Sequence, residues 1–209
     1  MLTKMLKTVA VVGLMSSISL AQTKPETGKF AVDSMHSKVG FEVPHLVISS
    51  VEGTFKAFTG EVEIDSDFTK SKVSTDVEIN SIDTGVGKRD DHLKSADFFD
   101  AKNHPKMTFK STSITGTPDS FKLIGDLTIR GNKKSVTFDG KYLGAVTDGY
   151  GNRKVAFKAS TKISRKEYGL KWSSTVEAGP VVGDEVTISL NIQAGKVVPK
   201  EEPKVAPKK

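Results

Sequence analysis

The four histidines are the side chains of this sequence best suited to metal binding or acid–base chemistry: His36, His45, His92 and His104. No two of them lie four residues apart, as a metal-binding pair on a helix would, and no His-x-His pair occurs. The chain also contains no cysteine. We therefore expect hydrogen-bonded structural histidines, with no metal ligand and no catalytic residue. A metal-dependent hydrolase that uses these loop histidines with Asp90 or Asp91 is the alternative from another class.

The densest polar cluster joins Asp83 and Thr84 to the run Arg89-Asp-Asp-His-Leu-Lys94. A carboxylate beside a histidine suggests acid–base catalysis, but adjacent residues at the start of a helix do not face each other. No Gly-x-Ser-x-Gly or comparable nucleophile setting occurs in the chain. We expect Asp90 to be a helix N-cap and Arg89 to reach loop carbonyls or a carboxylate. The cluster then forms a polar rim to an apolar site.

The elements that must position these residues are strands, because apolar residues fall at every second position in run after run. Phe121, Leu123, Leu127 and Ile129 alternate with polar neighbours, as do Val186, Ile188, Leu190 and Ile192 near the end of the chain. Alternation with period two is typical of a half-buried antiparallel strand. A sheet that is apolar on one face, with little helix to cover it, must close on itself or pack on a second sheet. We expect strands at residues 30–33, 37–43, 51–65, 72–80, 106–114, 121–130, 133–146, 152–163 and 184–194.

Three local features refine this all-β prediction. The alternation changes phase at Ala57-Phe58, which indicates a β-bulge within one long strand. Residues 90–99 and 43–50 read as short helical segments that could lie across a barrel end. The inward positions also include small residues, which either fit the taper of a packed barrel or clear a tunnel. These small residues are Ser111, Gly125, Gly140, Ala159 and Thr161.

The two ends of the chain differ from the middle. Residues 1–21 have the order of a secretory signal peptide, with Lys4 and Lys7, an apolar run and a small-x-small site at Ser19-Leu-Ala21. The apolar run is too short for a bilayer core, which needs roughly 20 residues. Residues 22–28 read as a linker, residues 29–195 as one domain, and residues 196–209 as a disordered tail rich in Lys and Pro.

The formal charge of +6 resides mainly in these ends. Lys4 and Lys7 contribute +2 and residues 196–209 contribute +3, which leaves +1 for residues 22–195. A domain so close to neutral is poorly suited to nucleic acid, since that binding depends on clustered positive charge. We expect no nucleic-acid partner. Transient contact of the tail with a membrane surface, and formation of a homodimer, are left open.

Many short motifs resemble those of one known family, the YceI-like family, in order and spacing across essentially all of residues 29–194. The motifs are Asp33-Ser-Met-His-Ser37, Phe41-Glu-Val-Pro-His45, Val51-Glu-Gly-Thr-Phe55, Phe58-Thr-Gly60, Ser81-Ile-Asp-Thr84, Arg89-Asp-Asp-His-Leu93, Asp97-Phe-Phe-Asp-Ala101, His104-Pro-Lys-Met-Thr-Phe109, Gly125-Asp-Leu-Thr-Ile-Arg-Gly131, Ile163-Ser-Arg165, Tyr168-Gly-Leu170 and Trp172. The resemblance implies an extended antiparallel eight-stranded barrel, similar to lipocalins, with one or two short helices. It also implies export to the bacterial periplasm and an internal tunnel that holds a polyisoprenoid or related amphiphile.

The function that this resemblance implies is non-enzymatic binding of a lipid-like small molecule, with no cofactor. The ligand is a polyisoprenoid such as a quinone tail, or alternatively a fatty acid or fatty amide. Besides this function and the metal-dependent hydrolase, a third hypothesis is a structural barrel with a packed interior. The resemblance implies that the ligand tail is bound by Phe41, Val43, Phe55, Phe109, Leu127, Phe157 and Ile163. It also implies that Leu93, Phe98 and Phe99 close the tunnel. The candidates for its polar end are Arg89, His92, Arg165 and Trp172.

Overall fold

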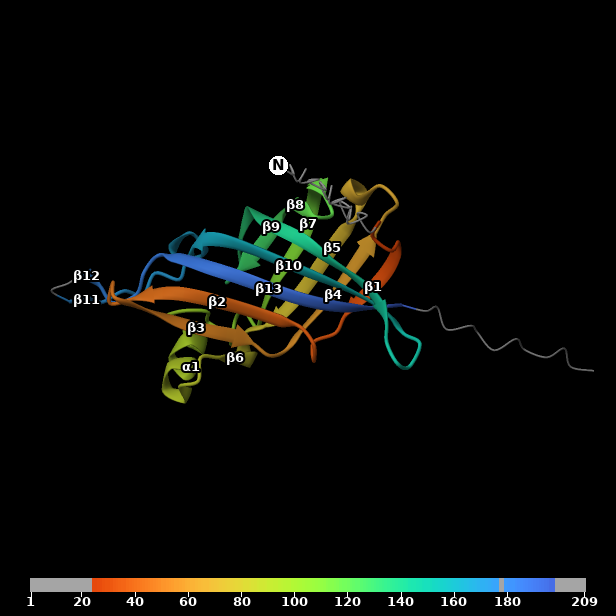
Figure 1. The fold of residues 1–209 in the computed structure, drawn as a ribbon. Helices are drawn as coiled ribbons and strands as arrows, with labels where there is room; N and C mark the ends of the chain where they lie inside the picture. Colours follow the sequence, from red (N-terminus) through yellow and green to blue (C-terminus); the bar gives the residue numbers. More distant parts are fainter. Residues whose placement is uncertain (1–23, 177–178, 198–209) are drawn as a thin grey trace, which may run out of the picture.

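The computed structural model describes residues 24–176 and 179–197, which form a closed antiparallel eight-stranded barrel (Figure 1). Three of the eight strand positions are split in two. Both β1 and β2 pair with β13, β4 pairs with β1 and β5, and β3 pairs with β2 and β6. The bounds are β1 Gly28–Val32, β2 Lys38–His45, β3 Ser49–Phe55, β4 Phe58–Ile64, β5 Lys72–Glu78, β6 Ile82–Asp83, β7 Lys106–Thr117, β8 Ser120–Ile129, β9 Asn132–Thr147, β10 Arg153–Ser164 and β13 Glu185–Lys196.

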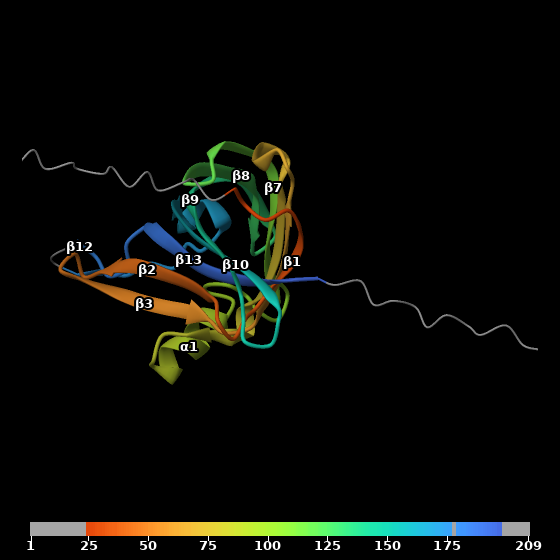
Figure 2. The same ribbon diagram turned by 45° about the vertical axis from the view of Figure 1, so that its right-hand side comes forward.

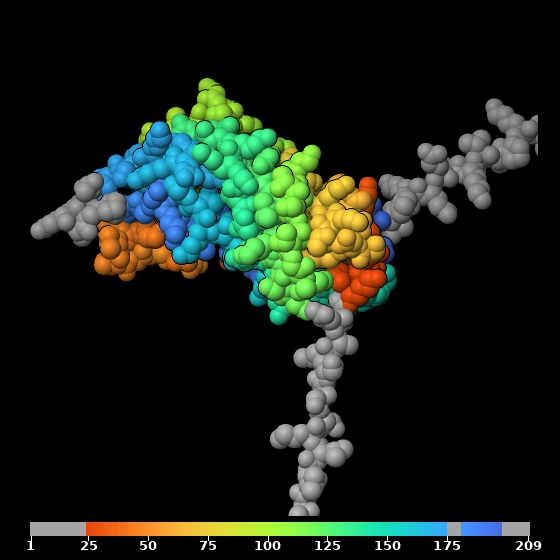
Figure 3. Space-filling model, turned by 90° about the horizontal axis from the view of Figure 1, so that it is seen from above, coloured from red at the N-terminus to blue at the C-terminus, as the bar shows by residue number. Residues whose placement is uncertain are grey.

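The eight strand positions follow one another around the wall in chain order. Each is hydrogen-bonded to the next, and β13 closes the barrel on β1 and β2. From above, the colours therefore pass in sequence order across the surface, from blue through green to yellow and red (Figure 3). A closed meander leaves no unpaired strand edge along most of the wall.

The alternation predicted from the sequence matches the two faces of this wall. Along β8, Phe121, Leu123, Leu127 and Ile129 are buried between more exposed neighbours. The run predicted as one bulged strand is divided into two strands: β3 ends at Phe55 and β4 begins at Phe58, three residues later. The rings of Phe55 and Phe58 are both buried. The all-β, lipocalin-like barrel is confirmed.

The first strand position is interrupted at residues 33–37, where one backbone hydrogen bond and the Ser37 side chain take the place of the regular ladder. The Asp33 N–H donates to the Gln193 carbonyl at 2.9 Å, and the Ser37 hydroxyl donates to the same carbonyl at 3.1 Å. Ser37 Oγ also accepts the Gln193 N–H at 2.9 Å. Thus β13 remains paired while the chain passes from β1 to β2.

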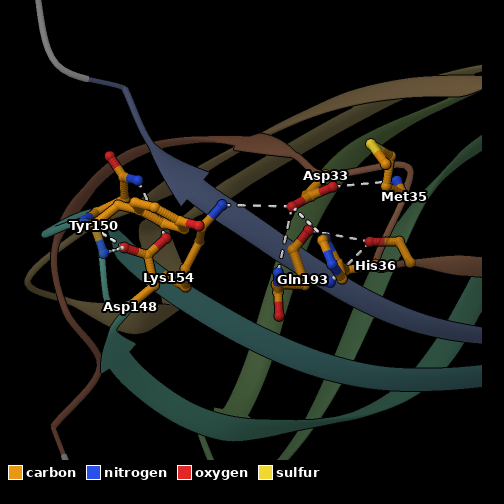
Figure 4. Close-up of polar contacts among 9 residues, drawn as sticks. Asp33, Met35, His36, Asp148, Tyr150, Lys154 and Gln193 are labelled. Carbon is orange, nitrogen blue, oxygen red and sulfur yellow. Dashed lines mark hydrogen bonds and ion pairs between the residues drawn. The ribbon is translucent and has the colours of Figure 1, made fainter.

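The Asp33 carboxylate connects this junction to the neighbouring strands β13 and β10 (Figure 4). Asp33 Oδ2 lies 2.9 Å from His36 Nδ1, 3.4 Å from Lys154 Nζ on β10 and 3.4 Å from Gln193 Nε2 on β13. The hydrogen bond with His36, reinforced by Lys154, lowers the pKa of Asp33 to about 2 even though partial burial opposes the shift. The cluster therefore carries a charged carboxylate at neutral pH.

Several small inward residues accommodate their neighbours instead of clearing a tunnel. A Cβ added at Gly140 would overlap the ring of Phe121, and one at Gly125 would overlap the ring of Phe109 and meet the Lys110 carbonyl at 2.5 Å. These rings therefore lie directly over the glycine backbone, the arrangement in which an aromatic side chain covers a strand glycine.

Of the other three small inward residues, two form hydrogen bonds and one lines a cavity. Ser111 Oγ accepts the Val73 N–H at 2.9 Å, and Thr161 Oγ1 donates to the Thr137 carbonyl at 2.7 Å. Ala159 alone of the five predicted small residues lines an internal cavity, which is described below. Of the five predicted small residues, Ala159 is therefore the one that still supports the prediction of a tunnel.

The helical predictions were less accurate. The α-helix α1 spans Gly87–Lys94, not residues 90–99, because the Ser95 hydroxyl and N–H both bind the His92 carbonyl and end it. The prediction of helix at residues 43–50 was wrong. That segment is the hairpin between β2 and β3, whose turn places Leu46 and Val47 at φ of 52° and 66°. Such left-handed backbone is uncommon for any residue other than glycine and rare for a β-branched one such as Val47, so no residue type in this segment indicated the turn.

The remaining short elements lie in connections at both ends of the barrel. The 3₁₀ turn Arg165–Tyr168 follows β10, and β11 (Thr175–Val176) pairs with β12 (Gly179–Pro180). Other 3₁₀ turns occur at Phe68–Lys70 and Ile79–Ser81. In Figures 1 and 2, β2, β3 and β12 project beyond the barrel with α1 beneath them.

The predicted signal peptide at residues 1–21 and nearly all of the predicted tail at 196–209 lie outside the described residues. Within residues 24–176 and 179–197, no helix has the length and apolar character needed to cross a bilayer.

Candidate functional site

Two adjoining cavities occupy the interior. The end cavity, of about 260 Å³, lies between β2, β3, the α1 segment and the connection that leads into β13. The barrel cavity, of about 130 Å³, lies inside the wall formed by β4, β5, β7, β8, β10 and β13. Val39, Met107 and Ile188 line both cavities. Together the two volumes reach the usual range for a small-molecule site, about 300–1,000 Å³.

All fourteen predicted ligand-binding residues line one of these cavities. Phe109, Leu127 and Phe157 line the barrel cavity. The others line the end cavity: Phe41, Val43, Phe55, Arg89, His92, Leu93, Phe98, Phe99, Ile163, Arg165 and Trp172. The structure therefore brings the set together in space, while contact of each residue with a ligand stays a prediction.

The barrel cavity is almost entirely apolar. Of the described residues that line it, none is charged, and the polar ones are Thr59, Ser71, Thr75 and Thr108. The Ser71 hydroxyl already accepts the Asp65 N–H at 3.1 Å. A cavity of this kind can take a hydrocarbon chain at no cost in polar desolvation.

Aromatic rings cover the end cavity from the α1 side. The His92 ring lies edge-on to Phe98 and to Trp172, with centroids 5.0 and 5.2 Å away, and Phe98 and Trp172 are 5.3 Å apart. His92 Nε2 is also 3.0 Å from Oδ2 of the exposed Asp97 side chain. These edge-to-face contacts fix the three rings as one group.

Sequence reasoning missed the residue that holds this aromatic group against the barrel. Arg130, at the end of β8, donates to the carbonyls of Ala96, Phe98 and Gly169 at 2.8, 2.8 and 3.0 Å. It therefore ties the segment after α1 to the segment after β10. Only the resemblance motif that contains Arg130 pointed to this position.

Arg89 is held at the cavity by the loop before α1. Its Nε donates to Thr84 Oγ1 at 2.7 Å, and its Nη2 donates to the Thr84 carbonyl at 2.8 Å. The expectation that Arg89 reaches a loop carbonyl is confirmed. Thr84 in turn donates its hydroxyl to Asp90 Oδ1 at 2.6 Å.

Asp90 does not have the predicted N-cap position. The N-cap residue is Val86, and Asp90 lies inside the first turn of α1. Its carboxylate, 8% exposed, accepts the Thr84 N–H at 3.0 Å as well as the Thr84 hydroxyl. The carboxylate thus holds the preceding loop against the helix. An aspartate at an N-cap has a similar local sequence pattern, so the sequence does not distinguish the two positions.

Arg165 lines the end cavity but is 3% exposed and bound to backbone carbonyls. Its Nε donates to the Gly183 carbonyl at 2.7 Å, and its two terminal nitrogens donate to the carbonyls of Leu170, Trp172 and Val182. Burial lowers the pKa of the Arg165 guanidinium, and nearby Asp184 opposes that shift. Arg165 therefore builds the wall of the cavity.

Some of the other lining residues could be predicted from the sequence, and others could not. Ile129, Val186 and Ile188 were inward positions of predicted strands. Val181 and Val182 come from the connection between β12 and β13, where no periodicity marks a buried face.

The histidines do not assemble a metal centre in the part of the chain that the structure describes. No group of three or more His, Asp or Glu side chains there is placed to hold an ion. His36 pairs with Asp33, and His92 pairs with Asp97.

A family model described as a YceI-like domain matches residues 30–194. The chain belongs to the YceI-like family. Protein YceI of Escherichia coli O157:H7 is 34% identical over 166 residues, which covers 79% of this chain and 84% of the relative. A UPF0312 protein of Staphylococcus epidermidis is 36% identical over 156 residues, which covers 74% and 89%.

Solved structures of YceI-like proteins and their neighbours agree with this barrel. BcnA of Burkholderia cenocepacia is similar with a TM-score of 0.69 and 25% identity, over 78% of this chain and 98% of that one. The YceI protein of Campylobacter jejuni has a TM-score of 0.65 and 30% identity, over 79% and 96%. A polyisoprenoid binding domain from Saccharophagus degradans, implicated in plant cell wall breakdown, has a TM-score of 0.61 over 82% and 100%. That domain is only 12% identical, so its likeness concerns the fold alone.

Proposed function

We propose that this YceI-like chain is a non-enzymatic binding protein that encloses a long-chain amphiphile, with the chain in the barrel cavity and the polar end in the end cavity. The observation that carries the proposal is the distribution of polarity: among the described residues, charged side chains line the end cavity and none lines the barrel cavity. A hydrocarbon chain in water gains about 0.8 kcal/mol for each CH₂ that becomes buried, so a carrier must enclose most of its length. Two adjoining cavities that share Val39, Met107 and Ile188 supply that length.

The chain itself is a polyisoprenoid or a fatty chain. A domain of the same fold is named for binding the first, and the apolar lining of the cavity beside Ala159 does not distinguish the two. We also propose that residues 1–21 direct export to the periplasm and that the mature chain begins near Gln22. Recovery of intact Met1 on native soluble protein would refute the export proposal.

A titration by chain length tests the binding proposal. Trp172, the one tryptophan of the chain, lines the end cavity, so its fluorescence reports on occupancy. With delipidated protein, we expect the Kd of saturated fatty acids to fall by up to roughly fourfold per added CH₂ and then to level off when the two cavities are full.

The same titration with isoprenyl alcohols of increasing length compares the two chain types. A larger gain per carbon for the isoprenyl series identifies the polyisoprenoid, and the reverse identifies the fatty chain. A Kd that is independent of chain length in both series would show that no chain enters the barrel, and would refute the proposal.

A further inference from the structure

The side chains of the end cavity share one sign of charge. Its titratable or charged lining residues are His45, Arg89, His92 and Arg165, and among the described residues no Asp or Glu lines it. Asp90 binds Thr84 and Asp97 binds His92 without lining the cavity. Asp91, which precedes His92, and Asp184, which lies near Arg165, do not line it either. A group that enters this cavity therefore meets positive charge that no lining carboxylate offsets.

The two arginines differ in what they can offer a ligand. Arg165 donates from all three of its nitrogens to backbone carbonyls. Arg89 uses one edge of its guanidinium, Nε and Nη2, to grip Thr84. A guanidinium has five N–H donors in a planar fork, so the edge of Arg89 formed by Nη1 and the second N–H of Nη2 stays uncommitted. Arg89 forms no ion pair with any carboxylate in the described part of the chain.

The hydrogen bonds from Arg89 to Thr84 also restrict the position of the uncommitted guanidinium edge. Thr84 is held by Asp90 through both its N–H and its hydroxyl, so Arg89, Thr84 and Asp90 form a continuous chain of hydrogen bonds. Leu93, Phe98 and other apolar side chains line the same cavity and reduce its water content. Charge-assisted bonds are stronger in such surroundings, and bidentate pairing with a planar oxyanion is the preferred use of a guanidinium edge.

We propose that the end cavity is an oxyanion site, in which the uncommitted edge of Arg89 binds a carboxylate or phosphate head group of the enclosed amphiphile. The inference rests on the proposed function, because the head group is placed there by a chain that lies in the barrel cavity. It narrows the ligand class to acidic amphiphiles over neutral amides, alcohols and quinones of the same chain length.

The test compares ligands that share a chain and differ in the head group. Delipidated full-length protein is titrated with hexadecanoate, hexadecanamide and hexadecyl phosphate at one pH and one salt concentration, with Trp172 fluorescence as the readout. We expect at least one of the two oxyanions to bind at least about tenfold more tightly than the amide. The tighter of the two identifies carboxylate or phosphate as the natural head group.

Arg89→Gln should reduce that preference to near unity. Lys88→Gln is the matched control, since it removes the same charge from an exposed position on α1 that does not line the cavity. The control should keep the wild-type preference, which separates local pairing from the general field of the helix. If Arg89→Gln proves unfolded by circular dichroism, Arg89→Lys, which keeps the charge but cannot form the fork, should lower the preference and takes its place.

Equal affinity of wild type for all three ligands would overturn the head-group assignment while leaving the carrier intact. A preference that survives in folded Arg89→Gln would overturn it as well. Failure of all three ligands to bind the wild type would overturn the proposed function, and the head-group assignment with it.

Discussion

Arg165→Met is expected to lower the free energy of unfolding by at least about 3 kcal/mol, because the substitution removes every donor from a buried cluster of carbonyls. Arg165 is 3% exposed, and its partners include the carbonyls of Leu170, Trp172 and Gly183. Methionine fills similar space but leaves those acceptors without donors. Denaturant melts of wild type and variant measure the difference directly.

Two controls separate the loss of donors from the loss of charge. Lys166→Met removes a positive charge from an exposed position in the same 3₁₀ turn and should change stability by no more than about 0.5 kcal/mol. Arg165→Lys keeps the charge with fewer donors and should lie between wild type and Arg165→Met. An Arg165→Met variant within 1 kcal/mol of wild type would contradict the wall-building role of Arg165.

Ala159→Phe is expected to weaken chain binding by at least about tenfold while the delipidated barrel stays folded. Ala159 lines the barrel cavity on β10, beside Gly140 of β9 and Leu190 of β13. A phenyl ring there takes the space that the ligand chain needs. Because the ring enters an existing cavity, its cost to the delipidated protein should be at the low end of the roughly 1–3 kcal/mol typical of overpacking.

The matched control is Ser160→Phe, which places the same ring on the outer face of the same strand. It should leave both ligand affinity and the position of the ligand unchanged. Wild-type affinity in folded Ala159→Phe would remove Ala159 from the binding site. Severe destabilisation, together with no binding by wild type, would favour a solid barrel.

The strands of the barrel wall were predictable because the alternation of apolar and polar residues that indicates them lies within each strand. Alternating residues such as Phe121 and Leu123 face one side of a strand whatever their partners are, and the phase shift at Phe58 is visible within a few residues. The aromatic lining followed from the resemblance of the motifs. Both sources identified which residues face inward.

The filling of the interior was not predictable, because it depends on register between strands. Whether Gly125 leaves space is decided by the ring of Phe109, sixteen residues away on β7, which covers the glycine. Likewise, the donors of Arg165 reach carbonyls on a connection without periodicity, so a residue expected at the polar end of a ligand proved to support the wall. Residue type alone does not distinguish an arginine with a free edge, such as Arg89, from one that is fully bound.

Enclosure of a long-chain amphiphile can be checked by a mass spectrum of the organic extract of the natively purified protein. We expect a long-chain amphiphile in near-stoichiometric amount in wild type and Ser160→Phe, and a marked depletion in Ala159→Phe. A folded wild-type protein whose extract contains no chain-bearing compound, and which takes up none when fatty acids or isoprenyl compounds are supplied, would contradict it.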